Sequence, residues 1–333
     1  MTNTSSPSHQ APTRATPTPQ PPADGAIELG ILPVYGGMAP SSCNAQPWAF
    51  RRANGGIEIV ADPGHAPAGD EAGYRETVVS CGAALFNMRV ALRHFGWHDV
   101  VLRGPDPRNP RLLARLVPGK HEPEMPRDRS LFYAIPRRHT VRTGFLRRPV
   151  PSSLIEQSRE AASAHGAWLH AISDPNDRRA VADLVHQALM YPADVGGDAV
   201  CDSWPAPPDV IPAPVADLAP PPSTVGRFAA AAAAARWMMD DAAVLLLLGT
   251  AHDDADEWLA AGEALEEVLL CAAVQDVSAA YANQPLRIPS LRPLVAGCAG
   301  CRGVPHVLFA LGHAAETTAT PRRAAADTLA RAG

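Results

Sequence analysis

Residues 39–48 of this 333-residue chain read APSSCNAQPW. Pro40 and Pro47 fix their own φ and push the residue before each toward extended backbone, so we expect a stiff, non-helical loop. The loop carries four hydroxyl and amide side chains: Ser41, Ser42, Asn44 and Gln46. Their mixture of donors and acceptors suits the edge of a flat heterocycle better than a single charge. The alternative is a polar turn that leads into a strand, with Trp48 as a core anchor.

Outside this loop, a pattern of strand, long helix and strand occurs twice. Apolar residues recur at three- and four-residue spacing over 74–95 and again over 256–274, which predicts two long buried helices. Gly82-Ala-Ala-Leu85 in the first helix matches Gly262-Glu-Ala-Leu265 in the second. Apolar runs predict the flanking strands: 56–61 and 100–102 around the first helix, 243–248 and 304–309 around the second. A period this long indicates an internal duplication and not a solenoid.

A basic segment lies between the two copies of this pattern and reads Arg137-Arg138-His139-Thr140-Val141-Arg142. On an extended backbone Arg138, Thr140 and Arg142 point the same way, because side chains alternate between two faces. Two guanidinium groups and a hydroxyl on one face suit a phosphate dianion, through bidentate charge-assisted hydrogen bonds. The alternative is a solvated basic edge, since Arg147 and Arg148 follow closely.

Together the loop and the basic segment resemble the nitroreductase-like flavoproteins, in particular their Acg-like actinobacterial branch. The resemblance runs from about Ile27 to His313. It implies an α+β, nitroreductase-like three-layer fold with mixed, mainly antiparallel sheets and long core helices. Ordinary nitroreductases are homodimers with FMN at the subunit interface, whereas the Acg-like branch resembles that dimer fused into one chain. We therefore expect an internally duplicated pseudo-dimer with one complete flavin site, present as a monomer or a weak homodimer.

The resemblance also implies which residues hold FMN. The cofactor-binding residues that it indicates are Pro40, Ser41, Ser42 and Asn44 for the ring and ribityl chain, Arg138, Thr140 and Arg142 for the phosphate, and Gln284 for the far side of the ring. No residue is expected to be catalytic in its own right, because the flavin carries the redox chemistry. NADH or NADPH would be the electron donor, and a nitroaromatic or quinone-like small molecule the acceptor. No GxGxxG segment opens a strand-turn-helix unit, so a separate nicotinamide-binding domain is not expected.

Two departures from the family pattern keep other functions open. Cys43 stands where related Acg-like sequences tend to carry His, and Phe309–Gly312 lacks the basic residue expected near the closing strand. Arg322 and Arg323 lie farther downstream. Besides an NAD(P)H-dependent flavin oxidoreductase, the sequence allows an FMN-binding or FMN-sequestering protein with little turnover. It also allows a structural relic that has lost FMN.

Composition shifts predict how the chain is divided. The expected segments are a disordered lead at 1–25, a first nitroreductase-like half at 26–125, a second half at 126–315 and a flexible tail at 316–333. Within the second half, the proline-rich stretch 202–222 is expected to fold over the flavin as a lid, with a flexible interdomain linker as the alternative.

Charge, hydropathy and cysteine content exclude other classes. A formal net charge of −5 argues against a nucleic-acid surface, which needs a clustered basic face. No apolar run approaches the roughly 20 residues that cross a bilayer, and the first residues lack a signal peptide's apolar core, so we expect a cytoplasmic protein without membrane contact. Cys298 and Cys301 form a CxxC without a second CxxC or an HxxxH, so no metal site is expected, and a structural pair is favoured over a redox pair.

Overall fold

The computed structural model describes residues 28–66, 70–141, 144–189, 243–314 and 320–329. The predicted lead, the predicted lid at 202–222 and Arg142 lie outside these residues. The elements of the first part are η1 (Leu29–Ile31), α1 (Leu32–Gly36), η2 (Ser42–Asn44), β1 (Trp48–Ala53), β2 (Gly56–Ala61), η3 (Pro63–His65), α2 (Glu71–His94), β3 (Trp97–Arg103), β4 (Leu112–His121), α3 (Pro126–Ala134) and η4 (Ile135–Arg137). Those of the second part are α4 (Ser152–Ala164), β5 (Trp168–Ile172), α5 (Pro175–Leu189), β6 (Val244–Thr250), α9 (Ala255–Val274), β7 (Ser278–Tyr281), α10 (Gln284–Arg287), α11 (Arg292–Cys298), β8 (Val304–Gly312) and α12 (Ala325–Thr328).

Two four-stranded sheets have the same strand order, β1-β2-β4-β3 and β5-β6-β8-β7. Every strand pair within them is antiparallel, and the register shifts at equivalent places, between Ile59 and Val60 in β2 and between Leu248 and Gly249 in β6. We call β1-β2-α2-β3-β4 the first repeat and β5-β6-α9-β7-β8 the second repeat. This repetition confirms the predicted α+β duplication. Parallel pairing, expected from a mixed sheet, occurs among the described residues only as two isolated bridges.

One predicted equivalence between the repeats was wrong. The sequence pairs the strand at 100–102 with the one at 304–309, but these residues lie in β3 and β8, which hold different places in the two sheets. The counterpart of β3 is β7, a four-residue strand that reads SAAY. Its two alanines and terminal Ser and Tyr do not form the β-branched or aromatic run that marks a strand in a sequence. The sequence pattern therefore pairs β3 with β8, the next strand along the chain.

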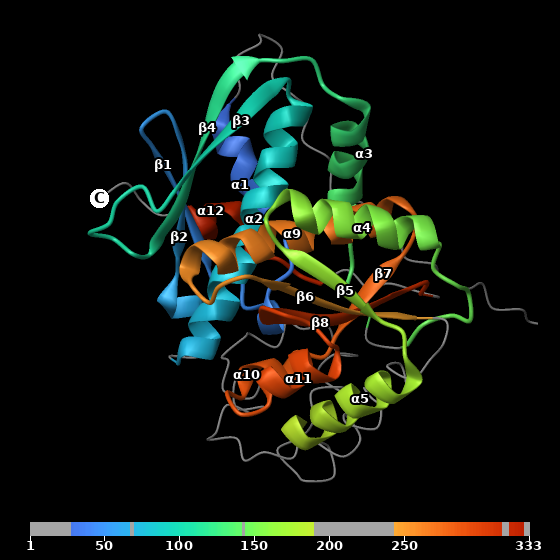
Figure 1. Ribbon diagram of the computed structural model, residues 1–333. Coiled ribbons are helices and arrows are strands. Elements are labelled where there is room, and N and C mark those ends of the chain that lie inside the picture. Colours follow the sequence, from blue (N-terminus) through green and yellow to red (C-terminus); the bar gives the residue numbers. More distant parts are fainter. Residues whose placement is uncertain (1–27, 67–69, 142–143, 190–242, 315–319, 330–333) are drawn as a thin grey trace, which may run out of the picture.

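The two long helices cross at the centre of the molecule, with the first sheet on one side and the second sheet on the other (Figure 1). Both helices begin at an aspartate cap: the Asp70 carboxylate accepts from Gly73 N–H, and the Asp254 carboxylate from Glu257 N–H. At the crossing, a Cβ on Gly82 would lie 2.2 Å from the Leu259 carbonyl oxygen. The helices therefore approach so closely that only glycine fits there.

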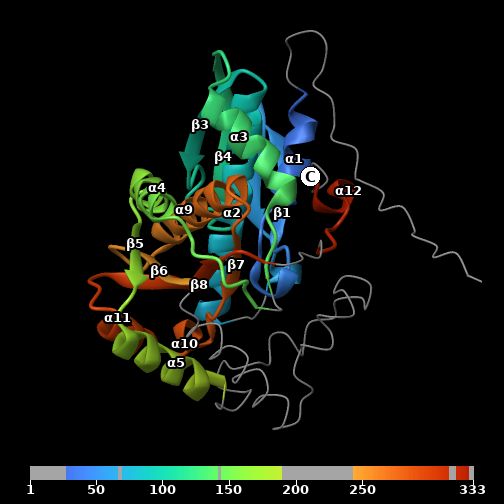
Figure 2. The ribbon, with the colours of Figure 1, turned by 90° about the vertical axis from the view of Figure 1, so that its right-hand side faces the viewer.

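A core built from both repeats surrounds the two helices, and a smaller one lies beyond the second sheet. Strand β6 serves both: Leu246 and Leu248 face the main core, whereas Leu245 and Leu247 face the smaller core, which α5, α10 and α11 cover (Figure 2). Burial on both faces explains why this strand reads as an unbroken apolar run. Among the described helices, none combines the length and the apolar character needed to span a bilayer.

The chain's last described residues, 320–329, pack against the first repeat. Leu329 forms an isolated parallel bridge with Phe50 of β1, and α12 lies beside the first sheet in Figure 2. The sequence predicts a flexible tail at 316–333. The described residues within it are bonded to the first repeat, Arg322 to Asn44 and Arg323 to Gln46.

Candidate functional site

The predicted loop at 41–46 has an unusual backbone. Cys43, Asn44 and Gln46 have φ of 50°, 56° and 52°, a left-handed region that residues other than glycine rarely adopt. Besides two backbone hydrogen bonds, two that involve side chains hold the loop: Gln46 N–H donates to Ser41 Oγ at 2.9 Å, and Gln46 Nε2 donates to the Asn44 carbonyl at 3.3 Å. Backbone strain of this kind persists only where surrounding contacts fix it, and it clusters at functional sites.

The loop sits on helix α2, which links it to the second repeat. Ser42 Oγ donates to Glu76 Oε2 at 2.9 Å, and the same carboxylate oxygen lies 3.8 Å from Arg287 Nη1 in α10. One residue earlier on α2, Arg75 Nη2 donates to the Leu286 carbonyl at 2.6 Å. Helix α10 therefore adjoins the loop, and Gln284, at its start, shares this side of the site.

Two arginines of the C-terminal stretch reach the loop from the other side. Arg322 Nη1 donates to Asn44 Oδ1 at 3.1 Å, and Asn44 Nδ2 donates to the Pro321 carbonyl at 3.0 Å. Arg323 N–H donates to Gln46 Oε1 at 2.8 Å. Both loop amides thus bond to residues about 277 positions away in the sequence.

The predicted basic segment approaches the same place from between the repeats. Val141 N–H donates to the Ala279 carbonyl at 2.8 Å, and Thr140 bridges Ala279, so the segment runs beside β7. Thr140 is half-buried, whereas Arg138 is only 6% exposed. Arg138 Nη2 donates to the Met38 carbonyl at 3.2 Å, and Arg322 Nη2 donates to that same oxygen at 3.3 Å.

A buried carboxylate lies beneath these arginines. Glu266 of α9 is fully buried, and its Oε1 lies 3.5 Å from Arg138 Nε. Burial raises the pKa of Glu266 to about 7, against the opposing attraction of Arg138, the Asn87 amide and Arg322. The Arg138 guanidinium is therefore turned inward toward Glu266 and does not stand free on an exposed basic edge.

Unpaired polar atoms mark one wall of the site. Gln284 Oε1 and the Nε and Nη2 atoms of Arg287 are buried and have no hydrogen-bond partner among the described residues. Buried polar groups are nearly always satisfied, so each such atom needs an explanation. A polar ligand between α10 and the loop would supply the missing acceptors and donors. A donor-rich site of this kind suits a phosphate-bearing heterocycle.

The structure brings together loop residues Pro40 to Asn44, Arg138 and Gln284 at the junction of the two repeats, with Thr140 beside them along β7. Sequence reasoning missed Glu76, Glu266 and Arg287. A signal for the two glutamates exists, because each stands in a long helix at a position that its apolar neighbours predict to be buried. No comparable signal marks Arg287, which follows β7 in a one-turn helix.

Comparisons with known proteins were made for the whole chain. No protein-family model matches it. The chain is 30% identical over 301 residues to proteins of Mycobacterium tuberculosis strains H37Rv and CDC 1551 that are named NAD(P)H nitroreductases, covering 86% of this chain and 86% of theirs. It is 28% identical over 302 residues to uncharacterised proteins of the same strains, covering 85% of this chain and 86% of theirs. A solved FMN and NADPH-dependent nitroreductase, NfnB from Sphigopyxis sp. strain HMH, matches 61% of this chain and 99% of its own with 18% identity and a TM-score of 0.46.

Proposed function

The chain belongs to the NAD(P)H nitroreductase family, and from this premise we propose that it is an FMN-dependent oxidoreductase. It takes electrons from NADH or NADPH and passes them, through FMN bound between its two repeats, to nitro or quinone-like small molecules. Since one chain supplies both repeats, the proposal needs no second copy of the protein. We also propose a cytoplasmic location for the protein.

One observation carries the proposal: segments far apart in the sequence meet at a single polar junction. Ser42 of the loop bonds to Glu76 of α2. Arg138, almost 100 residues later in the sequence, bonds to the Met38 carbonyl just before the loop. Arg322 reaches the same carbonyl from the C-terminal stretch. A junction of two repeats lined by arginines, amides and hydroxyls has the chemistry to bind a flavin mononucleotide.

The unpaired atoms of α10 match the hydrogen-bonding groups of FMN. Arg287 Nε and Nη2 are donors without acceptors among the described residues, and Gln284 Oε1 is an acceptor without a donor. A flavin ring offers carbonyl oxygens and ring nitrogens to such donors, and its N–H group or a ribityl hydroxyl to such an acceptor. Gln284 and Arg287 therefore match FMN both as hydrogen-bond acceptor and as hydrogen-bond donor.

The proposed roles of the chain's residues follow from their contacts. Pro40, Ser41, Ser42 and Asn44 shape the strained loop that would border the ring and ribityl chain, and Arg138 and Thr140 would lie toward the phosphate. Arg142, which lies outside the described residues, is proposed with them from the sequence alone. Arg322 supplies a positive charge that the closing strand β8 lacks. FMN would supply the redox chemistry when bound, and these residues would bind, orient and shield the ring.

The test is a visible absorption spectrum of the purified protein, before and after anaerobic addition of NADPH. We expect a flavin spectrum that NADPH bleaches within seconds. A flavin spectrum that dithionite bleaches and NADPH does not would favour the FMN-sequestering alternative. A colourless protein that does not take up added FMN would overturn the proposal.

A further inference from the structure

The duplication creates a second place equivalent to the proposed flavin site. Loop 41–46 directly precedes β1, and the end of α4 with His165 directly precedes β5, the equivalent strand. Counting from the crossed glycines Gly82 and Gly262, Phe86 of α2 stands where Glu266 stands in α9. By the same count Glu267 is equivalent to Asn87. Any remnant of a second site must therefore lie around Phe86, His165 and Glu267.

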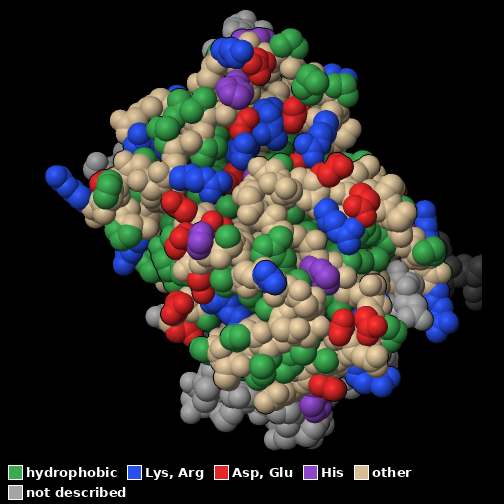
Figure 3. Space-filling view, viewed as in Figure 1, with side chains coloured by type: hydrophobic (Ala, Val, Ile, Leu, Met, Phe, Trp, Pro, Cys, Tyr) green, Lys and Arg blue, Asp and Glu red, His purple; other side chains and the backbone are tan. Residues whose placement is uncertain are grey.

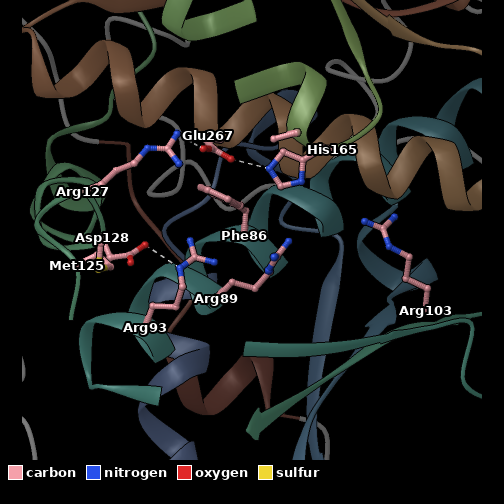
Figure 4. Close-up of a pocket in the computed structure, with 10 residues that line it drawn as sticks. Phe86, Arg89, Arg93, Arg103, Met125, Arg127, Asp128, His165 and Glu267 are labelled. Atoms are coloured by element: carbon pink, nitrogen blue, oxygen red, sulfur yellow. Dashed lines mark hydrogen bonds and ion pairs between the residues drawn. The ribbon is translucent and has the colours of Figure 1, made fainter. Parts of the chain in front are cut away.

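A cavity of about 580 Å³ lies at this place, and Phe86, His165 and Glu267 all line it. Figure 4 shows Glu267 between Arg127 and His165 on one wall, with Arg89 and Arg93 on the other side of Phe86. On the corresponding face of the molecule, basic and acidic side chains gather around the upper centre (Figure 3). The volume is that of an ordinary small-molecule site.

Buried carboxylates hold the arginines of this cavity in place. Arg89 Nη1 donates to Glu263 Oε1 at 2.5 Å, and Arg89 Nε pairs with Asp99. Arg93 Nε donates to Asp128 at 2.7 Å, and Arg93 Nη1 to Asp99 at 3.1 Å. The side chains of Glu263 and Asp99 are at most 5% exposed, so these two carboxylates lie behind the guanidinium groups, whereas Asp128 and Glu267 line the cavity. These bonds use Nε and Nη1 of both arginines and leave Nη2 for other acceptors.

The remaining walls add one more guanidinium and an apolar surface. Arg103 pairs with Glu263 from the other side, and its own side chain is about one-third exposed. Phe86 is only 1% exposed and lies beneath the Arg93 guanidinium, 5.7 Å from its ring centre, so Met125 and Ala164, both exposed, supply the apolar surface. His165 Nε2 bonds to Glu267 Oε2 at 2.6 Å, which fixes the imidazole at the rim.

We propose that this cavity is a second small-molecule site, separate from the flavin site, that binds an aromatic phosphate monoester. The phosphate bonds to the Nη2 groups of Arg89 and Arg93 and to Arg103, and the aromatic part lies against Met125 and Ala164. Arginine suits this task because its fork of donors matches phosphate oxygens, and the buried carboxylates keep the forks oriented before binding. In this second site, arginines take the place of the loop amides of the proposed flavin site, and a ligand still binds.

The test is isothermal titration of the full-length protein, loaded with one equivalent of FMN where it takes FMN up and freed of excess, with phenyl phosphate, inorganic phosphate and phenol. We expect one phenyl phosphate per chain, bound more tightly than inorganic phosphate, and no saturable binding of phenol. The variant Ala164→Trp fills the cavity from an exposed lining position without removing an ion pair, and should weaken phenyl phosphate binding at least tenfold. Ser163→Trp, an exposed neighbour outside the lining, is the matched control and should bind as the parent does.

Two further outcomes separate this site from the flavin site. Arg287→Met alters the proposed flavin site and should leave phenyl phosphate binding unchanged. Binding that Arg287→Met abolishes, or that Ala164→Trp leaves intact, would overturn the proposal, as would the absence of saturable binding. The last result would make the arginines and carboxylates a purely structural ion-pair network. The titration needs no turnover, so it is independent of the proposed oxidoreductase activity.

Discussion

Arg138 Nε and Glu266 Oε1 lie 3.5 Å apart, and both side chains are buried between the two repeats. The arginine comes from the segment that leads into the second repeat, and the glutamate from the central helix of that repeat. Removing either partner leaves the other as a buried group without its counter-charge, which is strongly destabilising. The pair therefore ties the stability of the molecule to the proposed cofactor site.

The first prediction concerns the pH dependence of stability. Because the pKa of Glu266 is raised to about 7 in the folded protein, its stabilising contribution is fully present below its unfolded pKa and is lost as pH rises through 7. The glutamine of the Glu266→Gln variant does not ionise, so the variant does not lose this stability as pH rises. Between pH 5 and pH 8, the difference in unfolding free energy between parent and variant should shift by about 2 kcal/mol in favour of the variant.

Urea unfolding at the two pH values measures this shift, and other titrating groups cancel in the difference. Glu160→Gln, an exposed position on α4, is the control and should show no shift. A difference for Glu266→Gln that stays constant from pH 5 to pH 8 would contradict the raised pKa.

The second prediction concerns the helix crossing. A Cβ added at Gly262 would lie 2.0 Å from the Val79 carbonyl oxygen, so Gly262→Ala must push α2 and α9 apart. We expect a loss of about 3 kcal/mol or more in unfolding free energy, the upper range of overpacking costs. Gly297→Ala in α11 meets open space and should be neutral or stabilising by up to about 1 kcal/mol. Thermal melting of both variants makes the comparison, and equal melting temperatures would exclude a close crossing.

The third prediction concerns the C-terminal stretch. Asn44→Ala and Arg322→Met each remove the hydrogen bond between Asn44 Oδ1 and Arg322 Nη1. A double-mutant cycle in urea should therefore show coupling on the order of 1 kcal/mol. Pairing Asn44→Ala with Arg147→Met, at an exposed arginine, should show none. Additive effects of the first pair would mean that the stretch does not lie on the loop in solution.

The fourth prediction concerns flavin content. Arg287→Met removes two buried donors that lack partners among the described residues, and should lower the affinity of the folded protein for FMN by tenfold or more. Arg302→Met, at an exposed position, is the control for the lost charge. Flavin fluorescence during titration with FMN measures the affinity. An unchanged affinity for FMN in Arg287→Met would mean that FMN does not contact α10.

Much of the fold could be predicted because local patterns are direct consequences of burial. The three- and four-residue apolar spacing marked α2 and α9, and the continuous apolar run marked β6, since each of these elements packs against a core. The loop at 41–46 could be predicted as a stiff polar segment from its prolines and amides. The short strand β7 could not be found, because its four residues carry no strand signal of their own.

By itself, the sequence determined the two long helices, the duplication and the loop chemistry, because residue spacing alone encodes which face of an element is apolar. The tertiary structure decided that Arg138 faces Glu266, that Arg322 and Arg323 bond to the loop amides, and that the arginines around Phe86 share one cavity. These contacts join residues up to 278 positions apart. Their partners are chosen by how helices cross and sheets stack, which no local pattern of residues records.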